Sequence, residues 1–322
     1  MILVLIEHDR GELAPASLEA LTAARALAAD AGGPVEALAI GADSDGLVET
    51  LAAYGVETVH QSHHELLTDY GPELWGEVLA QAIDSLSPAF VLACGTDRGS
   101  EVLAQAAARR DLPMVANCVE IRLGSPLELT RVRWGGSLLE VATLDAPVAV
   151  LTIAHHSVDS VPADAPAAGG TSPHPPILDP VLARSVVRGR VEREAGVTLA
   201  TAPVVVGGGR GVGSPEGFAP LEELAALLDG AVGCSRAATN NGWRNHTDQV
   251  GQTGTRIAPE IYFACGISGA IQHWVGAMAA KNIVAVNTDP EANMVTRAGY
   301  AVIGDLHEVV PAIAAEIDRR RR

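Results

Sequence analysis

The sequence predicts an α/β protein of two domains, and three observations lead to this prediction. Short runs rich in Val, Ile and Leu alternate with longer Ala/Leu-rich runs, which is typical of a parallel sheet covered by helices on both faces. A length of 322 residues suits two domains of ordinary size. A stretch rich in Pro and Gly separates two regions of alternation. We therefore expect an N-terminal α/β domain over residues 1–160, a connecting segment over 161–197 and a C-terminal, doubly wound α/β domain over 198–322.

The N-terminal domain is expected to open with a buried strand, because the apolar run at its start is far shorter than the ~20 residues that span a bilayer. Strands are expected at Ile2–Glu7, Val35–Ile40, Thr58–Val59 and Phe90–Ala93. Helices are expected at Pro15–Ala31, Leu47–Tyr54 and Leu74–Leu86, and from a cap at Ser100 to Arg110.

The pattern then changes to short β-like runs between Glu120 and Ile153. We expect these runs, such as Leu138–Thr143 and Val148–Ile153, to be antiparallel strands appended to the parallel sheet.

The Pro- and Gly-rich segment after residue 160 is expected to be an exposed connection, since its composition favours neither helix nor sheet. His155, His156 and His174 lie in or beside it. Histidine can bind a metal ion, but no cysteine or pair of carboxylates is near these residues in the sequence. We therefore expect no metal site.

The C-terminal domain repeats the strand–helix rhythm. Strands are expected at Ala202–Val206, Ala231–Cys234, Ile261–Cys265, Ile283–Val286 and Tyr300–Ile303. Ser214 and Pro215 mark a helix start, and the apolar stripe behind it comprises Phe218, Leu221, Leu224, Ala225 and Leu228. A last helix is expected from Leu306 to about Ile317.

Composition narrows the classes of function. The formal charge of −17 argues against a nucleic-acid partner, because binding phosphates requires basic patches. The cysteines Cys94, Cys118, Cys234 and Cys265 lie far apart, which indicates buried thiols in a reducing compartment. We expect a cytoplasmic protein that is not embedded in a membrane.

Two glycine-containing loops suggest a dinucleotide site. Gln249–Gly254 is a polar turn with glycine on both sides of Gln252 and Thr253. Gly266–Gly269 opens an amphipathic segment, where unpaired backbone N–H groups can receive a phosphate. One loop could hold the pyrophosphate while the other contacts the reactive ring.

The cluster Gly207–Gly211 invites comparison with the Rossmann fingerprint, but Val212 stands where its third glycine belongs. A structural turn accounts for it equally well. Arg210 within it is a bidentate donor suited to a phosphate.

Ser235 and Arg236 follow a short strand, and residues at this end of a parallel strand face the ligand crevice. Arg236 is either a plain surface arginine or a cation that stabilises negative charge on a reduced ring.

The geometry of an expected helix indicates on which side His273 lies. In a helix starting at Ser268, the apolar face comprises Ile271, Trp274, Val275 and Met278. His273 lies instead with small residues such as Gly276 and Ala277, where we expect room for a flat ring and an N–H donor for a ring carbonyl.

The sequence contains no G-x-S-x-G, H-E-x-x-H or P-loop motif and no other constellation specific to a reaction, so we expect no catalytic residue. A ring-binding site without acid/base groups fits an electron carrier better than an enzyme. The alternatives are a flavin- or NAD-dependent oxidoreductase with its own small substrate, and a nucleotide-binding module without redox chemistry.

These motifs closely resemble those of the electron transfer flavoprotein α subunit (FixB) family, and the likeness is densest in the C-terminal domain. The matching segments are Gly208–Gly211, Gly233–Ala238, Val250–Gly254, Gly266–His273, Asn287 with Asp289–Ala292, and Gly304–Leu306. The resemblance implies an FAD-binding C-terminal domain, a heterodimer with a β subunit, and no substrate turnover by the carrier itself.

The resemblance also implies which residues hold FAD. Carried over by motif, they are Arg210, Ser235, Arg236, Val250, Gly251, Gln252, Thr253, Ser268, Gly269, Ala270, Ile271, Gln272, His273, Asn287, Asp305 and Leu306. Thr253 is expected near flavin N5, His273 at the pyrimidine-side carbonyl and Arg236 against the ring, where they favour an anionic one-electron reduced flavin. Asp305 and Leu306 are expected at the adenosine end.

The implied role is transfer of electrons from dehydrogenases, such as the acyl-CoA dehydrogenases of fatty acid β-oxidation, to a membrane quinone oxidoreductase. A bifurcating variant would need a second FAD in the β subunit. Some positions depart from the family pattern: amides occupy Asn240 and Asn241, where an acidic residue is usual, Thr288 replaces a lysine and Asn293 a proline. These changes leave the redox potential and the choice of partner open.

Overall fold

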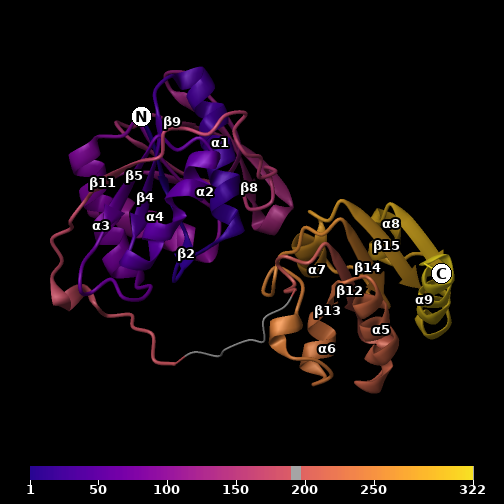
Figure 1. Ribbon diagram of the computed structural model, residues 1–322. Helices are drawn as coiled ribbons and strands as arrows, with labels where there is room; N and C mark the ends of the chain where they lie inside the picture. The colour runs from indigo at the N-terminus through magenta and orange to yellow at the C-terminus, as the bar shows by residue number, and fades with distance from the viewer. Residues whose placement is uncertain (190–196, 322) are drawn as a thin grey trace. The chain divides into compact units, whose positions relative to one another are not determined.

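The computed structural model describes residues 1–189 and 197–321 (Figure 1). The chain divides into two compact units, Met1–Val191 and Glu192–Arg322. The division lies within the segment expected to connect the two domains. Each unit is described by itself.

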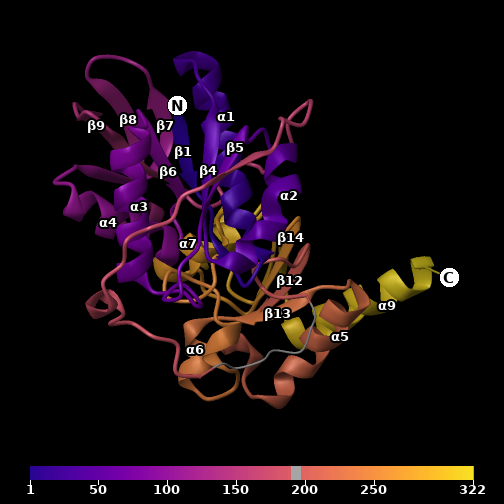
Figure 2. The same ribbon diagram turned by 60° about the vertical axis from the view of Figure 1, so that its left-hand side comes forward.

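The first unit is built on one sheet of nine strands in the order β11-β5-β4-β1-β6-β10-β7-β8-β9 (Figures 1 and 2). The parallel strands are β1 (Ile2–Leu5), β4 (Val35–Ile40), β5 (Thr58–Ser62), β6 (Phe90–Cys94), β7 (Met114–Arg122), β10 (Ala149–Ile153) and β11 (Gly170–Pro173). The antiparallel strands at one edge are β8 (Leu127–Arg133) and β9 (Leu138–Leu144). A small hairpin, β2 (His8–Asp9) and β3 (Glu12–Leu13), follows β1.

Helices cover both faces of this sheet, as the sequence predicted. Alternate residues of β1 face opposite cores: Ile2 and Val4 pack with α1 (Pro15–Ala31) and α2 (Val48–Ala53). Leu3 and Leu5 pack with α3 (Pro72–Leu86) and α4 (Asp97–Arg109). A strand buried on both sides has no polar face, which is why the run that opens the chain is wholly apolar.

Three expectations for this unit were wrong. The run Val148–Ile153 is not antiparallel: β10 lies parallel between β6 and β7, and all its residues are buried, as a central parallel strand requires. The Pro/Gly-rich segment is not free of strand, because β11 pairs with β5 at the sheet edge, where proline is tolerated. Helix α4 is capped by Thr96, whose Oγ1 accepts from Gly99 N at 2.9 Å, rather than by Ser100.

The second unit contains five parallel strands in the order β13-β12-β14-β15-β16. They are β12 (Val204–Gly208), β13 (Ala231–Cys234), β14 (Ile261–Cys265), β15 (Asn282–Asn287) and β16 (Tyr300–Ile303). All five strands were predicted, with small shifts of their ends. Because β12 has later strands on both sides, the strand order reverses beside it, and in such sheets a crevice opens at the carboxyl ends there.

Helices lie on both faces of this sheet too, so the unit is doubly wound. The helices of one face are α5 (Ala219–Leu227) and α9 (Leu306–Arg321), and those of the other are α7 (Ile271–Ala277) and α8 (Asn293–Arg297). The short α6 (Arg236–Asn240) follows β13. The predicted stripe of α5 is buried at Phe218, Leu221, Leu224 and Ala225. No helix in the described parts of the chain is long and apolar enough to cross a bilayer.

Candidate functional site

A pocket of about 610 Å³ lies at the carboxyl edge of the second sheet. Loops after all five strands line it, which is the place that doubly wound topology provides for a ligand. Of the residues predicted to hold a cofactor, the structure brings these into the lining: Arg210, Ser235, Arg236, Ser268, Gly269, Ala270, Gln272, His273, Asn287, Asp305 and Leu306. Topology therefore gathers in space residues from five separate segments of the chain.

Five predicted residues are not in the lining: Val250, Gly251, Gln252, Thr253 and Ile271. The loop that carries the first four runs beside α7, where Gln252 N donates to the Gln272 carbonyl at 2.7 Å. Thr253 is exposed, and its Oγ1 accepts from Gln249 Nε2 at 3.0 Å. The loop is therefore held next to the pocket, because its partner Gln272 lies in the lining beside His273.

The glycine cluster after β12 is a structural turn. The N–H groups of Gly209 and Gly211 donate to the carbonyls of Cys265 and Gly266, so they are not available to a phosphate. A Cβ on Gly209 would lie 2.2 Å from the Gly266 carbonyl oxygen, which explains the need for glycine there. What this turn offers a ligand is the exposed side chain of Arg210 at the pocket rim.

The loop after β14 depends on glycine for a different reason. Gly269 has φ +76°, and a Cβ there would lie 2.3 Å from Met294 N at the start of α8. The loop thus turns tightly over α8 before α7 begins at Ile271. Asn287 holds it from β15, because Asn287 Nδ2 donates to the Ile267 carbonyl at 3.0 Å.

The predicted helix start at Ser268 was wrong, because helix α7 starts at Ile271. The predicted apolar face was right in part: Val275 is buried and Trp274 packs against the core, whereas Ile271 and Met278 are 45% and 46% exposed. The buried side also carries His273, Gly276 and Ala277. Gly276 packs directly on the Gly251 backbone, since a Cβ there would lie 2.3 Å from Gly251 Cα. At Gly276, therefore, the room left by the small side chain is taken by protein and not by a ligand.

His273 contacts both the pocket and the core. Its Nε2 lies 2.8 Å from the hydroxyl oxygen of Tyr262, a fully buried residue of β14, so this nitrogen points into the core. Its Nδ1 is buried without a hydrogen-bond partner among the described residues. Burial lowers the pKa of His273 to about 4, against a smaller opposite effect of the Val250 backbone. The ring is therefore neutral at physiological pH.

Ser235 and Arg236 follow β13 as expected. Ser235 is buried, and its Oγ has no hydrogen-bond partner among the described residues. Arg236 is exposed at the rim, like Arg210. An unpaired buried hydroxyl costs free energy, so Ser235 Oγ is suited to a ligand that can bond with it.

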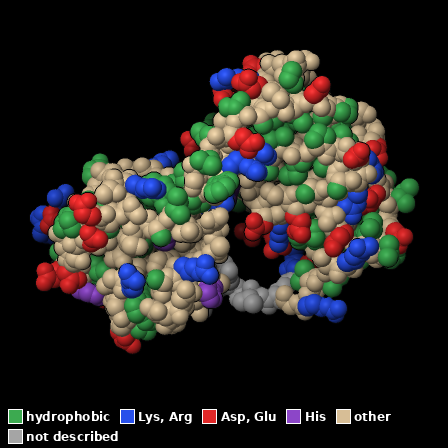
Figure 3. All heavy atoms as spheres, turned by 180° about the vertical axis from the view of Figure 1, so that it is seen from behind, with side chains coloured by type: hydrophobic (Ala, Val, Ile, Leu, Met, Phe, Trp, Pro, Cys, Tyr) green, Lys and Arg blue, Asp and Glu red, His purple; other side chains and the backbone are tan. Residues whose placement is uncertain are grey.

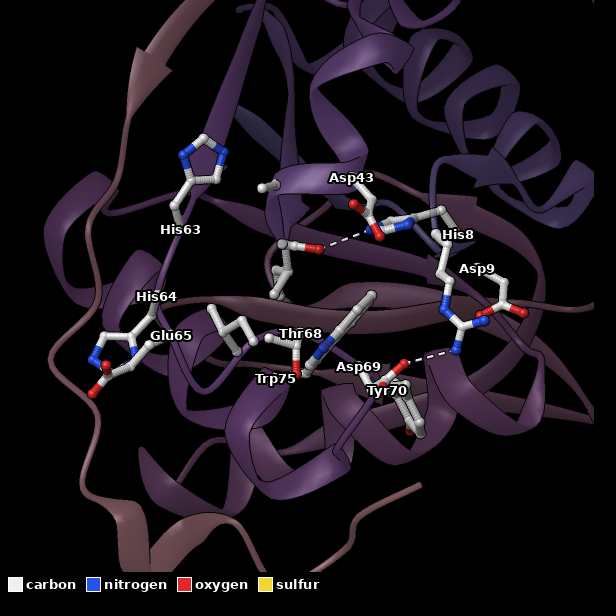
Figure 4. Close-up of a pocket in the computed structure, with 15 residues that line it drawn as sticks. His8, Asp9, Asp43, His63, His64, Glu65, Thr68, Asp69, Tyr70 and Trp75 are labelled. Atoms are coloured by element: carbon white, nitrogen blue, oxygen red, sulfur yellow. Dashed lines mark hydrogen bonds and ion pairs between the residues drawn. The ribbon is translucent and has the colours of Figure 1, made fainter. Parts of the chain in front are cut away.

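The structure also contains a pocket that the sequence did not predict. It measures about 510 Å³ and lies at the carboxyl edge of the first sheet, beyond β1, β4 and β5 (Figure 4). Arg10 pairs with Asp69 at 2.8 Å, and the His8 ring lies 5.5 Å from the Trp75 ring. Asp9, Asp43 and Glu65 also line it, so its charge disfavours a pyrophosphate. No motif marks these residues, because they come from three loops.

Comparison with known proteins assigns both units to one family. Residues 2–174 match the electron transfer flavoprotein domain, and residues 198–278 match the electron transfer flavoprotein FAD-binding domain. The electron transfer flavoprotein subunit alpha of Bacillus subtilis is 34% identical over 317 residues, covering 98% of this chain and 96% of that protein. The Mycobacterium tuberculosis H37Rv subunit is 37% identical, covering 99% of each. Protein FixB of Bradyrhizobium diazoefficiens is 32% identical, covering 98% of this chain and 88% of that protein.

The pocket of the second unit fits FAD, the cofactor of the matched domain. Its volume lies within the range of about 300–1,000 Å³ that is usual for cofactor sites. The unpartnered Ser235 Oγ and His273 Nδ1 are polar atoms that a ligand could satisfy, and Arg210 and Arg236 place two positive charges in the lining. The chain thus belongs to the electron transfer flavoprotein α subunit family, whose C-terminal domain binds FAD.

Proposed function

We propose that this chain is the FAD-holding subunit of a cytoplasmic, heterodimeric electron carrier. It pairs with a β subunit, accepts electrons from dehydrogenases such as acyl-CoA dehydrogenases, and passes them to a quinone oxidoreductase at the membrane. When bound, FAD supplies the redox chemistry. The chain's own residues bind the cofactor, set its electrostatic surroundings and present it to partners.

The observation that carries this proposal is how the titratable groups of the pocket are engaged. The lining carboxylates Asp289 and Asp305 each accept a backbone N–H, from Glu291 and His307, at 2.9 Å. His273 is neutral, because burial lowers its pKa to about 4. Among the described lining residues, no nucleophilic side chain is hydrogen-bonded to a side-chain base, and a carrier needs no such pair.

The residues proposed to hold FAD divide by task. Arg210 and Arg236 place guanidinium groups at the rim, suited to phosphate and to negative charge on a reduced ring. Ser235 and His273 offer buried polar atoms, and Gly269 allows close backbone approach. The Val250–Thr253 loop, held at Gln272, is proposed to reach the ring from beside α7.

An exposed apolar surface on the first unit supports a protein partner. At the β8–β9 end of the sheet, Trp134, Leu138, Leu139 and Val141 are 81%, 53%, 70% and 68% exposed. Large apolar side chains gathered in one place mark an interaction surface. On the face shown in Figure 3, basic side chains are scattered among acidic ones, which suits a protein partner better than a nucleic acid.

Co-expression with a β subunit tests the proposal. The purified complex is expected to carry FAD, and an acyl-CoA dehydrogenase with its substrate should bleach the flavin absorbance. Replacing Trp134 and Leu139 together by Ser should abolish co-purification of the β subunit. Ile177→Ser, at a site 87% exposed on the same unit, is the control and should have no effect.

Two results would contradict this role. Turnover of a small substrate by the chain alone would identify an oxidoreductase with its own substrate. Purification of the complex without flavin would favour a nucleotide-binding module. Two FAD molecules per heterodimer, with coupled reduction of a high- and a low-potential acceptor, would instead show a bifurcating carrier.

A further inference from the structure

Four side chains with metal-ligating atoms meet at the carboxyl edge of the first sheet. Glu19 comes from α1, Cys94 ends β6, and His155 and His156 follow β10. The ligand atoms of Glu19, Cys94 and His155 all lie within 4.8 Å of one another. No metal was expected at these histidines, because no cysteine or pair of carboxylates is near them in the sequence. The fold brings a cysteine and a carboxylate to them.

The distances within this cluster are close to those of a coordination shell. His155 Nε2 lies 3.6 Å from Glu19 Oε1, and His156 Nδ1 lies 3.3 Å from the same oxygen. Cys94 Sγ lies 3.8 Å from Glu19 Oε2. Around a tetrahedral Zn²⁺ with ordinary bond lengths, ligand atoms stand roughly 3.4–3.6 Å apart. The separations from the Glu19 oxygens, 3.3–3.8 Å, are close to that spacing, and the ligand atoms of Cys94 and His155 lie within 4.8 Å of each other.

Backbone bonds hold the ligand-bearing segments in place. Cys94 is opposite Ile153 in the parallel pair of β6 and β10. Beyond that pair, Ala154 N donates to the Cys118 carbonyl at 2.8 Å, and His156 N donates to Glu19 Oε2 at 2.7 Å. Such a site is ordered before any ion arrives, which reduces the entropy that binding would cost.

The burial of these side chains favours a bound metal ion over a simple ion pair between Glu19 and a histidine. Glu19 and Cys94 are 7% and 4% exposed, and His156 Nε2 is buried with no partner among the described residues. If Glu19 only paired with a histidine, the Cys94 thiol would make no more than a weak hydrogen bond to the Glu19 carboxylate. A mixed set of thiolate, imidazole and carboxylate is one that Zn²⁺ prefers, and it disfavours Mg²⁺ and Ca²⁺, which take oxygen ligands.

We propose that Glu19, Cys94 and His155 bind one Zn²⁺ ion. The His156 ring is stacked on the His155 ring, with 3.6 Å between centroids, so it would have to turn to supply the fourth ligand; otherwise a water molecule would complete the tetrahedron. Coordination forms a zinc–sulfur bond, and the thiol proton is released to solvent. The ion would fasten α1 to the ends of β6 and β10. The His155 and His156 side chains, 22% and 13% exposed, give access from solvent. The proposal does not depend on FAD, since none of these residues lines the pocket of the second unit.

The test uses the full chain co-purified with its β subunit, with any affinity tag removed. After incubation with zinc and exhaustive dialysis, elemental analysis should find one zinc per heterodimer. Cobalt loaded in its place should give a thiolate-to-cobalt charge-transfer band and the strong visible bands of a tetrahedral site. Zinc should also raise the midpoint temperature of unfolding.

Single replacements show whether these side chains hold the ion. Cys94→Ala should remove the charge-transfer band. It should also lower zinc affinity by more than about tenfold, because replacing a residue that only orients a ligand already costs about that much. His155→Asn, at a partly exposed position, should lower affinity as well and is the variant that most easily keeps its fold. The matched controls are Cys118→Ala, another buried thiol of the unit, and His63→Asn, an exposed histidine. Both should bind like the unaltered protein.

The proposal is overturned if the unaltered complex keeps far less than one zinc after dialysis. It is also overturned if cobalt binds without a thiolate band, or if Cys94→Ala and His155→Asn bind zinc as the controls do. Circular dichroism and FAD content, unchanged in His155→Asn, separate loss of a ligand from loss of the fold.

Discussion

The two units place a pocket at the same topological position and line it with different chemistry. In both sheets the first strand lies inside the sheet, with later strands on either side, and a cavity opens beyond the carboxyl ends. The cavities are similar in size, about 510 and 610 Å³. Parallel topology thus decides where a pocket lies in each unit.

The loops decide what each pocket can hold. In the first unit they bring Asp9, Asp43 and Glu65 beside an Arg10–Asp69 pair. In the second they bring tight glycine turns, and two guanidinium groups balance the carboxylates of Asp289 and Asp305. The second set suits a pyrophosphate better, because in the first set the carboxylates outnumber the one guanidinium group of Arg10. Variants that change one pocket at a time test this difference between the two units.

The largest effect is expected at Gly269. Gly269→Ala adds a Cβ 2.3 Å from Met294 N at a left-handed φ, and over-packing of this kind costs about 1–3 kcal/mol. The loop must move, so FAD affinity should fall by roughly a hundredfold. Gly242→Ala is the matched control, since Gly242 also has positive φ but no atom within 4 Å of a Cβ. Equal FAD content in both variants, measured by flavin absorbance per chain, would show that the loop does not shape the site.

The second largest effect is expected in how the free energy of unfolding changes with pH. The native protein holds His273 neutral with a pKa of about 4, whereas in the unfolded chain its pKa is near 6.5. Its contribution to stability is therefore complete above about pH 6.5 and is lost as the pH falls toward 4, by about 3 kcal/mol in all. His273→Gln should remove this part of the pH dependence in urea unfolding. His307→Gln, at an exposed position, should retain it; identical curves for the two variants would place the titration elsewhere.

A smaller effect is expected at Arg236. Arg236→Ala removes one cation from the pocket rim, and a charge-assisted hydrogen bond at an exposed site should be worth about tenfold in FAD affinity. The loss should shrink at high salt. Fluorescence titration with FAD measures it. Arg320→Ala, which breaks an exposed pair with Glu316, serves as the control. An unchanged affinity would remove Arg236 from the site.

The smallest effect is expected in the first unit. Arg10→Ala breaks the half-exposed pair with Asp69, which should cost at most about 1 kcal/mol of the free energy of unfolding. FAD content should not change. A loss of FAD in this variant would mean that the two pockets are not independent, which contradicts the division of roles between the units.

Most of the fold could be predicted from the sequence, because each strand and helix has its own local pattern of apolar residues. All five strands of the second unit and the four long strand–helix pairs of the first were found from apolar runs and their length. The direction of β10 was missed, since its neighbours in sequence are antiparallel while its partners β6 and β7 come from elsewhere. The burial of His273 and Gly276 on α7 was missed because apolar periodicity takes no account of Gly251, whose backbone packs against Gly276.

The site was predicted in outline and not in detail. Ser235 and Arg236 were expected at a crevice because they follow a parallel strand, and Arg210 and Ser268 were expected to hold a cofactor by motif; all four line one pocket. That these residues hold FAD stays a prediction for the experiments above. The turn of His273 toward Tyr262 could not be foreseen, because a ring's orientation depends on its neighbours in space.

The alternation of elements, the glycines at turns and the segments that reach a sheet edge follow from the sequence alone, since these depend on neighbours within a few residues. That Glu19, Cys94 and His155 meet, that the proline-rich segment adds β11, and that one nitrogen of His273 faces the core follow only from the three-dimensional packing. Contacts between distant segments depend on how whole elements pack. No local pattern records that packing.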